Sequence, residues 1–263
     1  MNHFSQSIQL VKGTYSLIWR NQKVLWYGFL LVLVPMLLDV ITPFVLSFKE
    51  AIRWSDSFLT VIIIIALFNY IYALMGRKRI TFVQSFSFSP DLVWKGAIWA
   101  LILSLIRIGL EYSVLESGLQ FSGVPFYVHI DYMRFGIWLT RWFAVGLISL
   151  GIFFFLAILV KKNRGFVQTL KDSFIFVWEN LFVTIVALLT SFIWNIGLVL
   201  ALFSLVVALT WLIGLIFSIG LGFKWLTILG SIAAIPGAYL IFYIVVVWTI
   251  LPAVLYNQLS KSR

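Results

Sequence analysis

The sequence contains no cysteine, only two histidines, and few charges, with Asp, Glu, Lys and Arg making up 11% of its 263 residues. Without cysteine there are no disulfides, thiolate metal ligands or cysteine nucleophiles. His3 and His129 lie far apart in the sequence, which leaves no basis for a histidine metal site or a catalytic triad. A phosphate-binding G-x-x-x-x-G-K-S/T loop, a G-x-S-x-G elbow and an H-E-x-x-H motif are also missing. We therefore expect no enzymatic activity, no metal and no cofactor.

Apolar sequence dominates instead, at 62% of residues. About twenty helical residues span the ~30 Å hydrocarbon core of a bilayer, and several apolar runs reach that length. The predicted fold class is therefore an all-α integral membrane protein. Its apolar runs cover 24–48, 57–75, 95–115, 135–160 and 181–256.

The last run decides how many spans the chain has. Two crossings within 181–256 give about six transmembrane helices and leave 206–234 as a long apolar connection on the outer side. A third crossing gives seven spans and moves the C-terminus to the other face. We expect six.

The net charge of +10 is spread over short runs between the spans, which predicts no nucleic-acid partner. Alternating six spans across the membrane brings most of the Lys and Arg residues to one face. Because cytoplasmic loops are enriched in Lys and Arg, both termini are expected in the cytoplasm. The basic residues on this face are Lys12, Arg20, Lys23, Arg77, Lys78, Arg79, Lys95, Lys161, Lys162, Arg164, Lys171, Lys261 and Arg263.

An internal repeat accompanies these basic runs. "FVQSFSFSPDLVW" at 82–94 and "FVQTLKDSFIFVW" at 166–178 match at a period of 84 residues, and "FSQSIQLVKGTYSLIW" at 4–19 is a looser copy. In the copy at 4–19, apolar residues recur every three or four positions, which predicts one face of an amphipathic helix in the membrane interface. This apolar face comprises Phe4, Ile8, Val11, Tyr15 and Ile18.

Each repeat therefore consists of an amphipathic interfacial helix followed by a helical hairpin. Three such units, at about 1–76, 77–160 and 161–263, account for a single membrane domain over 1–263. Basic residues beside the amphipathic segments are suited to anionic headgroups, so membrane lipids on the cytoplasmic side are the expected partners. The basic residues assigned to the membrane surface are Arg77, Lys78, Arg79, Lys161, Lys162 and Arg164.

Four charges fall inside predicted spans: Asp39, Arg107, Glu111 and Arg141. Asp39 and Arg107 lie nine and eight residues before the outer ends of their spans, which places both ~12–14 Å deep at the ~1.5 Å helical rise. We predict the pairs Asp39–Arg107 and Glu111–Arg141, and an Arg107–Glu111 contact along one helix is an alternative. Such pairs either lock the spans together or line a polar path or substrate site open to the outer side.

The repeated pattern of a basic run, an F-x-Q-S/T segment and a span resembles bacterial multi-pass proteins related to the membrane domain of glycerophosphoryl diester phosphodiesterases. The resemblance implies a bacterial inner-membrane location, and it implies no catalysis because those enzymes carry their active site in a separate soluble domain. The expected function is non-enzymatic and lies in envelope- or lipid-related transport or in small-solute permeation. The alternative is a structural or assembly subunit that binds protein partners in the membrane.

Overall fold

The computed structural model describes residues 3–41, 49–115, 119–121, 128–130, 153–217 and 223–260. The chain divides into two compact units. Unit 1 combines Met1–Val32 with Asn180–Arg263, and unit 2 is Leu33–Glu179. The described elements are helices, apart from two short paired strands in unit 2.

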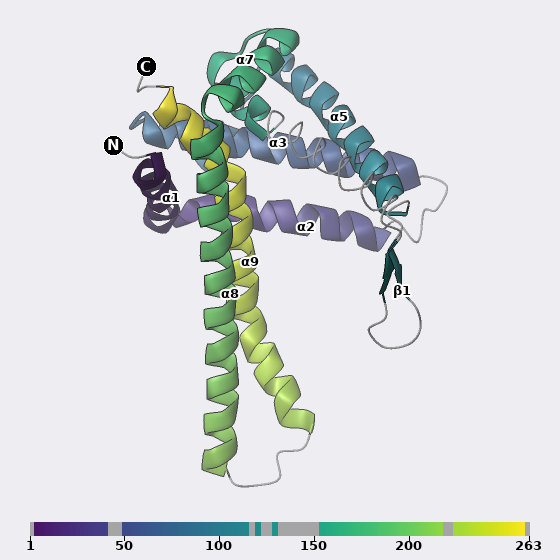
Figure 1. Ribbon diagram of the computed structural model, residues 1–263, viewed down its shortest axis with the longest axis vertical. Coiled ribbons are helices and arrows are strands. Elements are labelled where there is room, and N and C mark those ends of the chain that lie inside the picture. Colours follow the sequence, from purple (N-terminus) through teal and green to yellow (C-terminus); the bar gives the residue numbers. More distant parts are fainter. Residues whose placement is uncertain are drawn as a thin grey trace. The chain divides into compact units, whose positions relative to one another are not determined.

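Unit 1 is built around two long helices, α8 (Leu181–Phe217) and α9 (Phe223–Leu259), which lie side by side in Figure 1. Each has 37 residues, a length of about 55 Å at the helical rise, compared with ~30 Å of bilayer hydrocarbon. The described residues of the expected connection, 206–217 and 223–234, are helical and continue α8 and α9, while the candidate spans within these helices are Leu181–Leu209 and Pro236–Leu259. No proline or charge lies between 181 and 217 to interrupt α8.

Helix α1 (His3–Arg20) packs against both α8 and α9. The predicted apolar face is only partly buried, since Phe4 is 54% exposed. Two hydroxyl side chains are buried together with apolar residues of α1, and their small size allows close approach. Ser7 Oγ donates to the Val183 carbonyl at 3.2 Å, and Thr14 Oγ1 donates to the Leu10 carbonyl at 3.0 Å. The buried residues of α1 are Ser7, Leu10, Val11, Thr14 and Ile18.

A short 3-10 turn, η1 (Gln22–Val24), connects α1 to α2 (Leu25–Ile41). The start of α2 passes very close to α9 within unit 1. A Cβ atom built on Gly28 would lie 2.5 Å from Val246 Cγ2 and 2.7 Å from the Phe242 carbonyl oxygen. Only glycine allows the two helices to approach this closely.

Unit 2 contains α3 (Lys49–Met75) and α5 (Pro90–Leu115), which pack as an antiparallel pair. Ser104 Oγ donates to Ser57 Oγ at 2.8 Å, and Gly96 lies against Ile65 further along the pair. Residues 153–162 and α7 (Phe166–Glu179) are also helical. Strands β1 (Leu119–Phe121) and β2 (Val128–Ile130) pair antiparallel, with Gln120 opposite His129.

The segment 82–94 is helical in two pieces, with a break before Pro90. It begins with α4 (Phe82–Ser85), whose capping box joins Thr81 to Gln84: Thr81 Oγ1 accepts from Gln84 N, and Thr81 N donates to Gln84 Oε1. Residues 86–89 are non-helical, and α5 starts at Pro90. Proline suits the first turn of a helix but disfavours helical geometry at the residue before it, which explains the break.

Three described helices are long and apolar enough to cross a membrane: Ser55–Met75 in α3, Leu181–Leu209 in α8, and Pro236–Leu259 in α9. The bent pair Phe4–Arg20 and Gln22–Leu38 passes the same test as one unit, with a bend of 92° at its break. The predicted helical membrane class is therefore confirmed for the described part of the chain at the level of three such helices, or four with the bent pair.

Candidate functional site

The intramembrane charge cluster lies outside what the structure describes. The backbone of Asp39 belongs to α2 and those of Arg107 and Glu111 to α5, but the side chains of all three lie outside the described residues. Arg141 lies outside them entirely. The proposed pairing of these four charges therefore stays a prediction.

Both predicted surface basic runs lie in unit 2, next to each other. Tyr72, near the end of α3, donates its hydroxyl to the Ala157 carbonyl at 2.7 Å. Lys161 Nζ lies 5.9 Å from the centre of the Tyr72 ring, within range of a cation–π contact. Both helical segments thus end at the same place, each followed by a basic run. The exposed residues there are Arg77, Lys78, Arg79, Lys161, Lys162 and Arg164.

Aromatic packing holds this end of unit 2 together. The rings of Trp99 and Phe155 stack with their centres 4.3 Å apart. Phe155 also contacts Phe166, the first residue of the third repeat copy, at 4.8 Å. The first residue of α7 is thereby fixed directly after the basic run 161–164.

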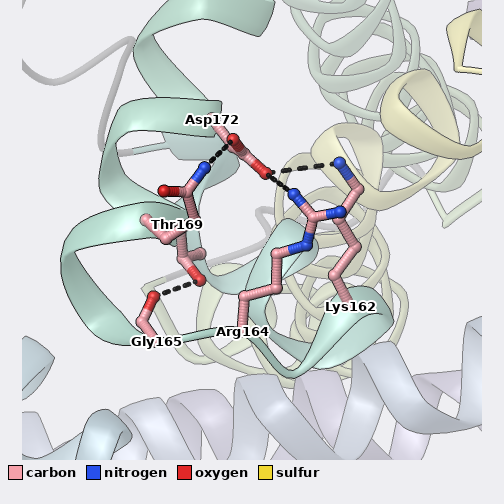
Figure 2. A network of polar contacts seen from close by, with 6 residues as sticks. Lys162, Arg164, Gly165, Thr169 and Asp172 are labelled. Carbon is pink, nitrogen blue, oxygen red and sulfur yellow. Dashed lines mark hydrogen bonds and ion pairs between the residues drawn. The ribbon is translucent and has the colours of Figure 1, made fainter.

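An acidic residue of α7 partly neutralises that run (Figure 2). Asp172 Oδ2 accepts from Arg164 Nη1 at 3.1 Å and from Lys162 Nζ at 3.3 Å. Its other oxygen accepts from Gln168 Nε2 at 3.1 Å. The glutamine of F-x-Q-S/T thus has different partners at 82–94 and at 166–178: Gln84 caps α4, whereas Gln168 donates to Asp172.

Two features are shared by the three segments that carry the F-x-Q-S/T pattern, 4–19, 82–94 and 166–178. The hydroxyl residue of F-x-Q-S/T is fully buried in each: Ser7, Ser85 and Thr169. The tryptophan that ends each copy is exposed, by 68% at Trp19, 67% at Trp94 and 80% at Trp178. Tryptophan is enriched at the membrane–water interface, so three exposed tryptophans suit such a boundary.

Two asparagines in apolar helices form hydrogen bonds to other helices. Asn69 Nδ2 donates to the Ser85 carbonyl at 3.3 Å and links α3 to α4. Asn195 Oδ1 on α8 accepts from the Tyr15 hydroxyl of α1 at 2.6 Å.

Lys95 is nearly buried and forms an ion pair with Asp91 one turn earlier, which removes Lys95 from the exposed basic surface.

Sequence reasoning missed an aromatic groove in unit 1. It has a volume of about 500 Å³ and lies where α1, α8 and α9 meet. The ring of Tyr15 lies between two other aromatic rings of the groove. Its centre is 5.9 Å from the ring centre of Trp194 and 5.8 Å from that of Tyr243. The residues lining the groove, which we call the aromatic groove, are Tyr15, Ser16, Trp19, Trp194, Leu198, Tyr239, Leu240 and Tyr243.

Buried polar atoms lie behind the Tyr15 wall. The Tyr15 hydroxyl donates to Asn195 Oδ1 at 2.6 Å, so Asn195 lies directly behind this wall. Asn195 is 5% exposed, and its Nδ2 has no hydrogen-bond partner among the described residues. The same is true of Ser191 Oγ. Two polar atoms are therefore unsatisfied close to the groove.

The signal for this groove in the sequence was weak. Tyr15 and Trp194 are separated by about 180 residues, and each looks like an ordinary interfacial or packing aromatic in its own segment. Within the described residues, no group of three or more His, Cys, Asp or Glu side chains is placed to hold a metal ion. Comparisons of the chain with protein-family models, curated proteins and solved structures gave no match. Its function therefore has to be inferred from the geometry of these residues.

Proposed function

We propose that the protein is a non-enzymatic, multi-pass protein of the bacterial inner membrane that takes part in lipid-related transport. The aromatic groove carries this proposal. It opens beside α8, whose apolar segment Leu181–Leu209 is mostly not buried; its buried residues are Val183, Thr184, Ala187, Ser191 and Asn195. An apolar helix with so little protein around it is suited to lipid, so a groove in its side is open to membrane amphiphiles.

The proposal includes an architecture of six spans and three repeats, with both termini in the cytoplasm. It is supported by the shared end of α3 and 153–162, because parallel helices that end together bring their basic runs to one face. It also includes the resemblance to the membrane domain of glycerophosphoryl diester phosphodiesterases, in architecture only. In this proposal the basic surface of unit 2 contacts anionic headgroups on the cytoplasmic side.

Small-solute permeation has less support than lipid handling. A polar path needs the charges Asp39, Arg107, Glu111 and Arg141, whereas the groove has an almost wholly apolar lining. A second candidate, a structural or assembly subunit, is favoured by the large apolar side chains on the surface of α8. Ile193 and Phe203 are more than half exposed and could pack against a partner helix instead of lipid.

Reconstitution separates these two functions. The full chain is placed in vesicles containing a headgroup-labelled fluorescent lipid, and the fraction of label reached by an external, impermeant quencher is followed over time. Lipid-related transport predicts faster movement of label across the bilayer than in protein-free vesicles, and slower movement when Ser16→Phe narrows the groove. Ser87→Phe, the same change at an exposed loop position of unit 2, is the control. Unchanged movement, together with a stoichiometric membrane partner that co-purifies with the chain, would favour the subunit.

A further inference from the structure

The size and lining of the aromatic groove restrict what it can hold. Its volume of about 500 Å³ lies within the ~300–1,000 Å³ range of ligand-binding pockets. Three tyrosines and two tryptophans line it, together with leucines and one serine, and no charged side chain does. Such walls accept an aliphatic chain, while the hydroxyl and indole groups provide hydrogen-bond donors near its edge.

Charge along α1 indicates the sign of the ligand's polar end. Lys12 and Arg20 each lie one helical turn from Ser16, a groove residue, and residues four apart share a helix face. Both side chains are exposed, and neither forms an ion pair with a described residue. Aromatic walls alone would also suit an organic cation. The positive charges of Lys12 and Arg20 beside the groove disfavour such a cation.

A third observation concerns the unsatisfied atoms behind Tyr15. Asn195 Nδ2 is a buried donor with no partner in the described part of the chain. The same side chain accepts a hydrogen bond from Tyr15, which lines the groove. A buried donor of this kind is stabilised by an acceptor oxygen. An ester-linked lipid carries such oxygens between its chain and its headgroup, whereas a hydrocarbon carries none.

We propose that the aromatic groove binds an anionic phospholipid of the surrounding membrane, with one acyl chain against the tyrosine and tryptophan rings and the phosphate headgroup beside Lys12 and Arg20. This inference rests on the proposed lipid-related function and names its ligand class. Each basic side chain near a membrane surface contributes ~1 kcal/mol to the free energy of binding an anionic lipid, which corresponds to a factor of about five in affinity. Two of them favour the anionic lipid about 25-fold over a zwitterionic lipid with the same chains.

The test uses the full chain in zwitterionic nanodiscs that contain a small share of phosphatidylglycerol with a photoreactive group in its acyl chain. After illumination, mass spectrometry maps the cross-linked residues, and unlabelled phosphatidylglycerol or phosphatidylcholine competes for the site. The double variant Lys12→Gln/Arg20→Gln removes the charges, and Ser16→Phe fills the groove. Arg79→Gln/Lys171→Gln removes two exposed charges of unit 2 as a control, and Ser87→Phe is the control for bulk.

The expected result is cross-linking to the groove residues of α1, α8 and α9, with phosphatidylglycerol competing about 25-fold better than phosphatidylcholine. Lys12→Gln/Arg20→Gln should remove that preference but keep the cross-link position, whereas Ser16→Phe should remove the cross-link. Equal competition by both lipids, or cross-links confined to other surfaces, would overturn the inference. The proposed function is judged separately by lipid movement in vesicles, which can persist when the groove has no headgroup preference.

Discussion

Replacing Gly28 with alanine should destabilise unit 1. The added methyl group would lie 2.5 Å from Val246 Cγ2 and 2.7 Å from the backbone oxygen of Phe242, both well inside van der Waals contact. Val246 can turn its side chain away, but the carbonyl oxygen moves only with α9 itself. Forcing an extra carbon into a packed contact costs ~1–3 kcal/mol. We expect a loss near the upper end of that range, because one of the two clashes is with backbone.

Two other glycines provide graded comparisons. A Cβ on Gly197 meets no atom within 4 Å, so Gly197→Ala should be neutral or stabilising by up to ~1 kcal/mol, the gain in helix propensity. A Cβ on Gly96 would lie 2.9 Å from Ile65 Cδ1, the flexible end of a side chain. Gly96→Ala should therefore fall between the other two.

The assay is unfolding of the purified chain in mixed micelles with a rising fraction of denaturing detergent, followed by circular dichroism and tryptophan fluorescence. The predicted order of stability is Gly197→Ala, then Gly96→Ala, then Gly28→Ala. A Gly28→Ala variant as stable as Gly197→Ala would show that α2 and α9 do not approach as described, and would refute the packing of unit 1.

Three further predictions concern polar side chains. Tyr15→Phe removes the donor to Asn195 and should cost ~1–3 kcal/mol, whereas Tyr15→Phe combined with Asn195→Leu should cost less than the single change; equal losses in the same unfolding assay would contradict this hydrogen bond. Asp172→Asn removes the counter-ion of Lys162 and Arg164, so binding of the chain's detergent complex to anionic vesicles should tighten and depend more steeply on salt, and unchanged binding would count against the network. In the cycle of Asp39→Asn, Arg107→Gln and the double variant, each single change should cost ~3–5 kcal/mol and the double change much less, and additive losses would end the predicted pairing.

The class of the fold could be predicted from the sequence, because an apolar run of twenty residues has few alternatives to a helix that crosses a membrane. The continuity of α8 could have been inferred as well, since 181–217 contains neither proline nor charge. The break before Pro90 was signalled by the proline itself. What the sequence obscured was the packing face of α1, because hydropathy ranks Phe4 above Ser7 although the small hydroxyl allows closer approach to α8.

The candidate site was less predictable than the fold, because the residues of the aromatic groove are far apart in the sequence. Helical periodicity relates residues three or four apart, so it places Lys12, Ser16 and Arg20 on one face of α1. It cannot relate Tyr15 to Trp194 or to Tyr243, because these residues come together only when α1 packs against α8 and α9. An asparagine in an apolar run, such as Asn195, is suited to bonding another helix, yet its partner on α1 followed only from the fold.

The most direct test of the central claim is single-cysteine accessibility in intact cells, which the cysteine-free sequence makes straightforward. Ser87→Cys and Lys171→Cys follow the two basic runs of unit 2, and Ser262→Cys reports on the C-terminus. We predict that an impermeant thiol reagent labels all three cysteines only after the membrane is permeabilised, whereas it labels Ser122→Cys in intact cells. Labelling of Ser87→Cys and Lys171→Cys from opposite sides would contradict it, because the α3 and 153–162 helices could not then end together at one face of the membrane.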